Sequence, residues 1–269
     1  MTQSLSVHSA DSADSLNSPD SSDSPNSSAP IATSTVITPA IDAAIDRLSP
    51  HLAAIARASY QDWTVATWDE FLAIAGEQEP DGLPQTQAYF YTPWMRLEMI
   101  PLGKDHGRLN NIPLKTATLF SAFRALKTVE YINTTLRKSG ELECQPDLSI
   151  YIGDVTCLPA AGNEVINLDQ FDPPSLVVEI AASSIADDLG MKRLLYERLG
   201  VREYWVIDTR QRSLIAFSIA DGRSGVISQS EVLPGLDLAI VDEALRRTDE
   251  NDDAAITRWL IETFNREKL

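Results

Sequence analysis

The most informative hydrophobic pattern is the apolar run from Leu176 to Ile180, which contains one acid, Glu179. Pro173 and Pro174 precede the run and two serines follow it. A short run rich in Val between such residues predicts a buried β-strand. A carboxylate inside a buried strand is costly unless another group pairs with it or binds it. The residues that the rest of the chain brings to Glu179 therefore decide the role of this acid.

Apolar residues recur at helical spacing in several other segments. Between residues 40 and 60 they predict two short helices separated by Ser49 and Pro50. Thr67 and Glu70 form a capping box for a helix that ends at Gly76. Further helices are predicted at 114–129, 242–247 and 256–264, and the last of these is amphipathic and expected to be peripheral.

The residues after the Glu179 strand predict a crossover to a parallel neighbour. Ser184 with Asp187 is a second capping box, which opens a helix that continues to Leu199 and stops at Gly200. The apolar segment 201–208 then predicts another strand. A strand, helix and strand in this order are typical of a right-handed crossover between parallel strands.

Alternating and aromatic segments predict the remaining strands. Segment 87–101 is expected to form a hairpin that bends at Pro93 and Trp94, with Glu98 in its second strand and a turn at 102–107. Asp147 opens the strand 145–153, which a loop at 154–172 follows. Other strands are predicted at 131–136, 142–144, 213–219 and 226–238. This order of elements predicts an α/β (α+β) domain with a mixed central sheet flanked by helices.

Changes in composition divide the 269 residues into four parts. Residues 1–39 are rich in Ser, Asp, Asn and Pro and predict a disordered tail, because they bury too little apolar surface to offset the entropy of ordering. Residues 40–62 form a helical extension, residues 63–247 the main domain, and residues 248–269 the C-terminal amphipathic helix.

The formal net charge of −17 argues against non-specific coating of nucleic acid, which depends on neutralising phosphates with Lys and Arg. It does not exclude an enzyme that approaches nucleic acid through a local basic patch and a bound cation.

The two cysteines, Cys144 and Cys157, lack metal-site spacing and are expected to be reduced. No stretch is apolar enough to span a membrane, and the N-terminus lacks a secretory signal, so we expect a cytoplasmic protein.

Three residues carry the candidate chemistry. Asp147 begins one strand directly after Pro146, Glu179 lies near the end of another, and Lys192 is on the following helix. Two carboxylates from adjacent strands repel each other and attract a hard cation, and Mg²⁺ takes one or two carboxylates together with water and phosphate oxygens. A nearby Lys can position or activate water for attack on phosphorus. Asp188 and Tyr196 lie one turn before and after Lys192, on the same helical face.

Each candidate also has a purely structural explanation. Asp147 would then be a turn residue, Glu179 would pair with a cation such as Arg193, Lys192 would be a solvated helix charge, and His106 would be an ordinary turn histidine. The residue patterns alone leave these alternatives open.

Asp147 after proline, followed by a separate apolar strand with Glu179, resembles the PD-(D/E)XK nuclease pattern. The detail resembles the Uma-two family of restriction endonucleases, in order and spacing, over roughly residues 63–245. The runs that carry this resemblance are Trp68-Asp69-Glu70-Phe71, Glu98 before His106-Gly107, Pro146-Asp147-Leu148-Ser149, Pro174-Ser175-Leu176-Val177-Val178-Glu179-Ile180, Asp187-Asp188 with Lys192, Gly200-Val201-Arg202-Glu203-Tyr204-Trp205-Val206-Ile207-Asp208 and Leu233-Pro234-Gly235-Leu236.

The resemblance implies a restriction-endonuclease-like core at residues 63–247 and metal-dependent hydrolysis of DNA phosphodiester bonds. It implies that Asp147 and Glu179 are ligands of Mg²⁺, which Mn²⁺ could replace, and that Glu98 is an accessory acid and ligand. Lys192 would be the catalytic lysine, because Ala181 stands where the wider nuclease pattern has Lys.

Two other functions remain compatible with the sequence. One is a catalytically inactive binding or assembly module on the same scaffold, and the other is hydrolysis of a different phosphoester. Nucleases that cut both strands often pair two sites about a two-fold axis, so a homodimer is also expected.

Overall fold

The computed structural model describes residues 37–75, 83–154, 157–250 and 252–266. The chain divides into two units, Met1–Thr33 and Ser34–Leu269, and all described residues lie in the second. The predicted disordered tail therefore lies almost entirely outside the described residues. Gly76, the predicted end of a helix, also lies outside them. The four-part division of the chain remains a prediction.

Two six-stranded sheets form the centre of the second unit. All neighbouring strands are antiparallel except β5 with β8 and β9 with β10, so both sheets are mixed. This confirms the predicted fold class, although the sequence indicated one sheet where the structure has two. The first sheet has the order β1 (Thr64–Val65), β3 (Trp94–Met99), β2 (Thr86–Tyr91), β6 (Leu142–Cys144), β5 (Leu136–Lys138) and β8 (Ile166–Asn167). The second has the order β12 (Arg223–Val226), β11 (Ser213–Ala220), β10 (Glu203–Asp208), β9 (Leu176–Ala181), β7 (Leu148–Ile152) and β4 (Thr128–Ile132).

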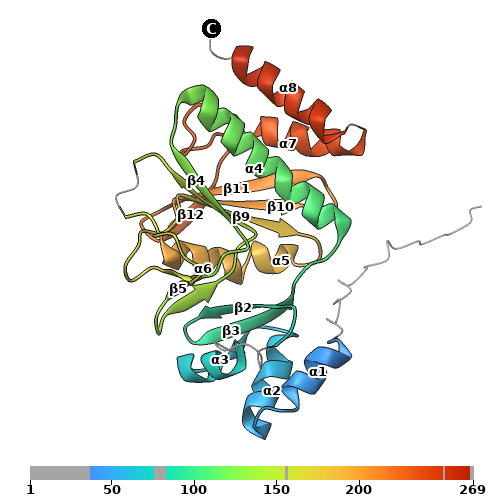
Figure 1. Ribbon diagram of the computed structural model, residues 1–269, viewed down its shortest axis with the longest axis vertical. Helices are drawn as coiled ribbons and strands as arrows, with labels where there is room; N and C mark the ends of the chain where they lie inside the picture. The colour runs from blue at the N-terminus through green and yellow to red at the C-terminus, as the bar shows by residue number, and fades with distance from the viewer. Residues whose placement is uncertain (1–36, 76–82, 155–156, 251, 267–269) are drawn as a thin grey trace, which may run out of the picture. The chain divides into compact units, whose positions relative to one another are not determined.

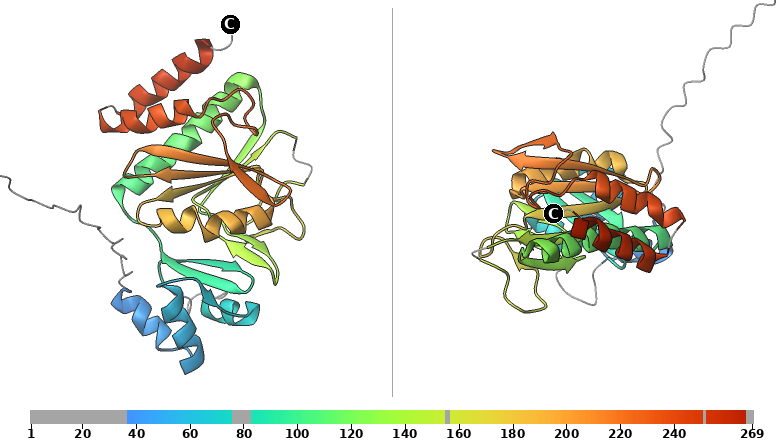
Figure 2. Two further views of the ribbon diagram at one scale, coloured as in Figure 1. Left: turned by 180° about the vertical axis from the view of Figure 1, so that it is seen from behind. Right: turned by 90° about the horizontal axis from the view of Figure 1, so that it is seen from above.

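Helices cover both faces of the second sheet (Figures 1 and 2). On one face lie α4 (Lys104–Arg124), α7 (Ala239–Arg246) and α8 (Asp253–Arg266), with the short 3₁₀ helix Arg247–Asp249 between the last two. On the other face lie α5 (Ile185–Asp188) and α6 (Met191–Leu199). The helices α1 (Pro39–Ile45), α2 (Pro50–Ser59) and α3 (Trp68–Ala75) pack against the first sheet.

Capping residues set the starts of the N-terminal helices. Ser49 separates α1 from α2 because its Oγ accepts a hydrogen bond from the amide of Leu52, with Pro50 in the first helical position. The predicted capping box of α3 is present: the amide of Thr67 donates to Oε2 of Glu70 at 2.7 Å, and the amide of Glu70 donates to Oγ1 of Thr67 at 3.3 Å.

Strand β9 is buried along its whole length and separates two hydrophobic clusters. Leu176, Val178 and Ile180 face the cluster under α4, α7 and α8. Val177 and Ala181 face the cluster between the two sheets and α6. Because side chains alternate along a strand, Glu179 belongs to this second face. The fold therefore places the unusual acid between the sheets.

The first helix of the main core is longer than the sequence indicated. We predicted a turn at 102–107 and a helix from residue 114, but α4 begins at Lys104 and continues through Pro113. Gly107 and Pro113 suggested breaks, yet an unbroken apolar face that includes Leu109, Ile112 and Phe120 is buried against the sheet. Burial of this face outweighs the hydrogen bond that the proline cannot donate. The predicted helix also ended too late, because residues 128–132 form β4.

The crossover after β9 contains two helices rather than one. The Ser184 capping box was wrong, because Oγ of Ser184 donates to the side chain of Asp188 at 2.6 Å instead of capping an amide. Gly190 separates α5 from α6. A Cβ there would lie 2.8 Å from the carbonyl oxygen of Ala186, so the close turn requires glycine. Gly200 ends α6 in the left-handed region, as predicted.

Two predictions about the C-terminal third were wrong. Segment 226–238 was expected to be a strand, but its pairing is limited to a single bridge between Gln229 and Asp237 and the end of β12 at Val226. The last helix was expected to be peripheral, yet Ile256, Leu260 and Phe264 of α8 are fully buried in the core cluster with α4. The amphipathic pattern could not show whether another helix lay against the apolar side.

Candidate active site

Asp147 and Glu179 come together where β7 and β9 separate. The antiparallel register ends at Leu148 with Val178, and Asp147 and Glu179 are the next residues on each strand. Instead of continuing the ladder through its backbone, Asp147 accepts a hydrogen bond from the amide of Ile180 through Oδ2 at 2.8 Å. Both acids are buried. The structure thus brings the two predicted ligands together at one position of the sheet.

The carboxyl group of Glu179 is held by a tyrosine. The hydroxyl of Tyr196 donates a hydrogen bond to Oε1 of Glu179 at 2.5 Å. Burial, together with the charges of Asp147 and Asp188, raises the pKa of Glu179 well above its ordinary value, even though Lys192 opposes the shift. A bound cation would oppose this shift by favouring the charged carboxylate.

Lys192 is at the centre of a buried group of charges. Its Nζ lies 2.8 Å from Oε2 of Glu98 and 3.0 Å from Oδ1 of Asp188, and it lies over the ring of Tyr89. Burial alone would lower the pKa of Lys192, but Asp188, Glu179 and Glu98 raise it well above its ordinary value. Lys192 is therefore not a solvated helix charge, and that alternative was wrong.

A chain of polar contacts joins Glu98 to the N-terminal part of the protein. Arg96 lies 3.7 Å from Glu98 and 3.4 Å from Asp187, measured from its Nε to the carboxylate oxygens. The indole N–H of Trp63 donates to Oδ1 of Asp187 at 2.5 Å. Burial alone would raise the pKa of Glu98, but Lys192 lowers it below its ordinary value. Burial and the charge of Glu98 raise the pKa of Asp187 to about 6.

His106 contacts Asp147 from the opposite side of the sheet. Its Nε2 lies 3.1 Å from Oδ1 of Asp147. Burial alone would lower the pKa of His106, but the hydrogen bond to Asp147 raises it. His106 belongs to the first turns of α4, so it is not a turn histidine.

The sequence missed several residues of this site. Neither Trp63 nor Tyr89 was predicted to have a role in the site, and Asp187 was named only as a cap residue and as part of the run with Asp188 and Lys192. Arg193, the proposed partner of Glu179, lies instead over the ring of Phe217. No local pattern could indicate these contacts, because each joins segments that are distant in sequence.

The donor set fits a hard cation in part. Asp147 and Glu179 supply the one or two carboxylates that Mg²⁺ takes together with water. Oε2 of Glu98 accepts a hydrogen bond from Lys192, and the predicted role of Glu98 as a third ligand remains a prediction. Within the described ranges, no group of three or more His, Cys, Asp or Glu side chains is arranged to hold a metal ion.

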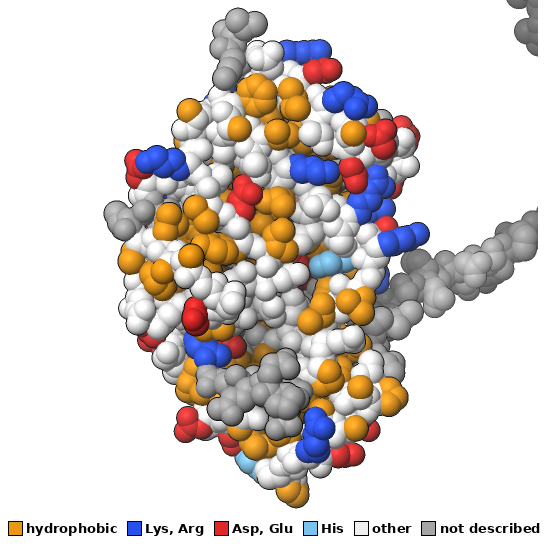
Figure 3. Space-filling model, viewed as in Figure 1, with side chains coloured by type: hydrophobic (Ala, Val, Ile, Leu, Met, Phe, Trp, Pro, Cys, Tyr) orange, Lys and Arg blue, Asp and Glu red, His pale blue; other side chains and the backbone are white. Residues whose placement is uncertain are grey.

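Positive side chains do not form a continuous track on the face seen in Figure 3, as far as its described side chains show. Blue and red side chains alternate there, mainly over α4, α7 and α8. Ion pairs explain this pattern: Arg108 lies 3.1 Å from Asp253, and Arg247 lies 3.0 Å from Glu243.

None of the helices in the described residues is both long and apolar enough to cross a membrane.

The described residues thus form a mixed α/β protein of two sheets flanked by helices, with two buried acids where β7 and β9 separate. The model of the Uma2 family, described as "Putative restriction endonuclease", matches residues 68–251, and the chain belongs to this family. A solved structure titled "putative nuclease belonging to DUF820", from Anabaena variabilis, is 16% identical with a TM-score of 0.46, and the match covers 67% of this chain and 99% of that one. No curated protein matches the chain.

Proposed function

We propose that this protein is a divalent-metal-dependent endonuclease that hydrolyses DNA phosphodiester bonds. The observation that carries the proposal is the pairing of Asp147 with Glu179 at the point where β7 and β9 separate, within reach of the buried charge of Lys192. Membership of a restriction endonuclease family supports the reaction class.

Asp147 and Glu179 would hold Mg²⁺ or Mn²⁺, and Glu98 would act beside them through Lys192. The ion, when bound, supplies a Lewis acid that stabilises negative charge on the phosphate and lowers the pKa of bound water. His106 and the amide of Ile180 orient Asp147, and Tyr196 orients Glu179.

Lys192 would act as a charged donor rather than as a base, because its neighbours keep it protonated. Glu98 accepts one of its three N–H donors and Asp188 forms an ion pair with it at 3.0 Å, and we assign a further donor to the phosphate or the attacking water. This division of roles keeps a fixed positive charge where negative charge develops.

Supercoiled plasmid incubated with Mg²⁺ or Mn²⁺ tests the proposal. Wild type should nick it, and EDTA, Asp147→Asn, Glu179→Gln or Lys192→Met should each reduce the rate roughly 100-fold or more. Glu203→Gln is the matched control, because Glu203 is a buried strand acid bonded to Trp205 and to the amide of Val232, away from the site. Equal nicking by Glu179→Gln and wild type would overturn the proposal.

The same assay addresses the competing functions. A nuclease-fold binding module would not cut plasmid, and Mg²⁺ would not change its behaviour. An enzyme for another phosphoester would bind Mg²⁺ but would leave the plasmid uncut. We further propose a homodimer, since cutting both strands requires two sites, and sedimentation of the full chain tests this.

A further inference from the structure

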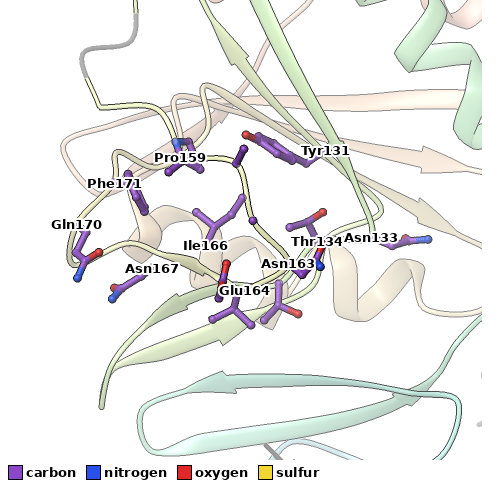
Figure 4. A pocket seen from close by; sticks show the side chains of 15 residues that line it. Tyr131, Asn133, Thr134, Pro159, Asn163, Glu164, Ile166, Asn167, Gln170 and Phe171 are labelled. Carbon is purple, nitrogen blue, oxygen red and sulfur yellow. The ribbon is translucent and has the colours of Figure 1, made fainter. Parts of the chain in front are cut away.

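A cavity of about 710 Å³ lies beside the candidate active site and has no part in the reaction described above. It opens between the end of β4, strand β8 and the loop that precedes β9. Figure 4 shows Tyr131, Ile166 and Phe171 around the hollow, with Thr134, Asn163 and Glu164 at its lower edge. Its volume is in the range of sites that bind small molecules.

The cavity is close to Asp147 because β4 pairs with β7. The amide of Asn133, a lining residue, donates to the carbonyl oxygen of Asp147 at 3.2 Å. Tyr131 is opposite Ser149, which is two residues, or about 7 Å, along the strand from Asp147.

Tyr131 also lies on the same face of the sheet as Glu179. Tyr131 is paired with Ser149, and Ser149 is paired with Val177. Residues directly opposite in antiparallel strands share a face, and residues two apart on one strand share it too. Tyr131, which lines the cavity, therefore lies on the same side of the second sheet as Glu179.

The lining is suited to a neutral, planar group. Among the residues that line the cavity, the one acid is Glu164, and there is no Lys, Arg or His. A phosphate would find no positive charge there. The rings of Tyr131 and Phe171 offer stacking surfaces, and the amides of Asn163 and its polar neighbours offer both donors and acceptors. Nucleic-acid bases that have left the helix are bound by such combinations of rings and amides.

Tyr131 is held in place for this role. Its ring meets that of Tyr151 edge to face at 5.9 Å, and the hydroxyl of Tyr151 donates to the carbonyl oxygen of Asp172. A ring positioned by a buried neighbour loses little entropy when a base stacks on it.

We propose that this cavity binds an unpaired base of the DNA substrate next to the phosphate that is cut, so that the enzyme prefers single-stranded segments to uninterrupted duplex. The inference rests on the proposed function, since it names the substrate class of the same site.

Binding of a fluorescent single-stranded oligonucleotide to Glu179→Gln, in the presence of EDTA, tests the proposal without cleavage. We expect the double variant Tyr131→Leu with Glu179→Gln to bind the oligonucleotide roughly tenfold more weakly than Glu179→Gln alone. An oligonucleotide with abasic positions through its centre should bind both proteins with the same, weaker affinity. Tyr91→Leu, at a half-buried tyrosine of β2, is the control and should bind as the parent does.

Asn163→Ala, on the exposed part of the loop, provides a second variant if Tyr131→Leu fails to fold. Unchanged affinity in the folded cavity variants, or equal affinity for normal and abasic strands, would overturn the proposal. If these variants bind normally while Glu179→Gln still abolishes plasmid nicking, the cavity proposal fails and the nuclease stands. If wild type cuts no DNA but Tyr131→Leu weakens binding, the nuclease fails and the base site stands.

Discussion

Nζ of Lys192 lies 2.8 Å from Oε2 of Glu98, which joins α6 to the first sheet across 94 positions of sequence. Asp188 completes the contact from α5. The lysine is almost fully buried, so its charge is stable there only because these acids surround it. One contact thus links the packing of the two sheets to the electrostatics of the site.

Lys192→Met should destabilise the protein by about 3–5 kcal/mol, because it leaves buried carboxylates without their cation. Urea unfolding measures the change. Adding Glu98→Gln should restore part of the loss, since it removes one of the uncompensated charges. If Lys192→Met alone is as stable as wild type, the ion pairs of Lys192 contribute little to folding.

Trp63→Phe should cost about 1–3 kcal/mol, because Asp187 then loses the N–H that the indole donates. Trp94→Phe is the control, because Trp94 is 37% exposed and should tolerate the change. Thermal or urea unfolding compares the two variants. Equal effects would mean that the contact of Trp63 with Asp187 does not stabilise the site.

Phe264→Ala should cost about 3–5 kcal/mol, because Phe264 is fully buried and packs edge to face on Phe120 at 5.4 Å. Ile261→Ala on the same helix is 40% exposed and should change stability by less than about 0.5 kcal/mol. If both variants unfold at the wild-type urea concentration, α8 is peripheral after all.

Stability should depend on pH through Glu203. Burial raises the pKa of Glu203 above its ordinary value of 4.5 despite the hydrogen bonds it accepts. The folded protein therefore holds this proton more tightly than the unfolded chain, so the contribution is greatest below 4.5 and is lost as pH rises through the folded pKa. Wild type should be more stable relative to Glu203→Gln in mild acid than at neutral pH. Urea unfolding at both values measures the difference, and a constant difference would contradict the shift.

Local patterns predicted the elements of the site but not its contacts. The apolar run around Glu179, the Pro-Asp start of β7 and the Gly200 stop were visible because each depends on neighbours in sequence. Gly107 and Pro113 misled the interpretation, since the buried face that overrides them exists only once α4 packs on the sheet.

The partners of Lys192 show the same limit. Asp188 was predicted from helical spacing, whereas the bond to Glu98 depends on how the two sheets pack. The second sheet was likewise not predicted, because short strands such as β5 and β6 indicate pairing without indicating which sheet they join.

Calorimetric titration of Mn²⁺ into the full chain tests the central claim most directly, because it reports on the acid pair without requiring a substrate. Wild type and Glu203→Gln should bind the ion alike, and Asp147→Asn and Glu179→Gln should each lose that binding. Identical binding curves for all four proteins, or no binding to wild type, would contradict the assignment of Asp147 and Glu179 as a metal site.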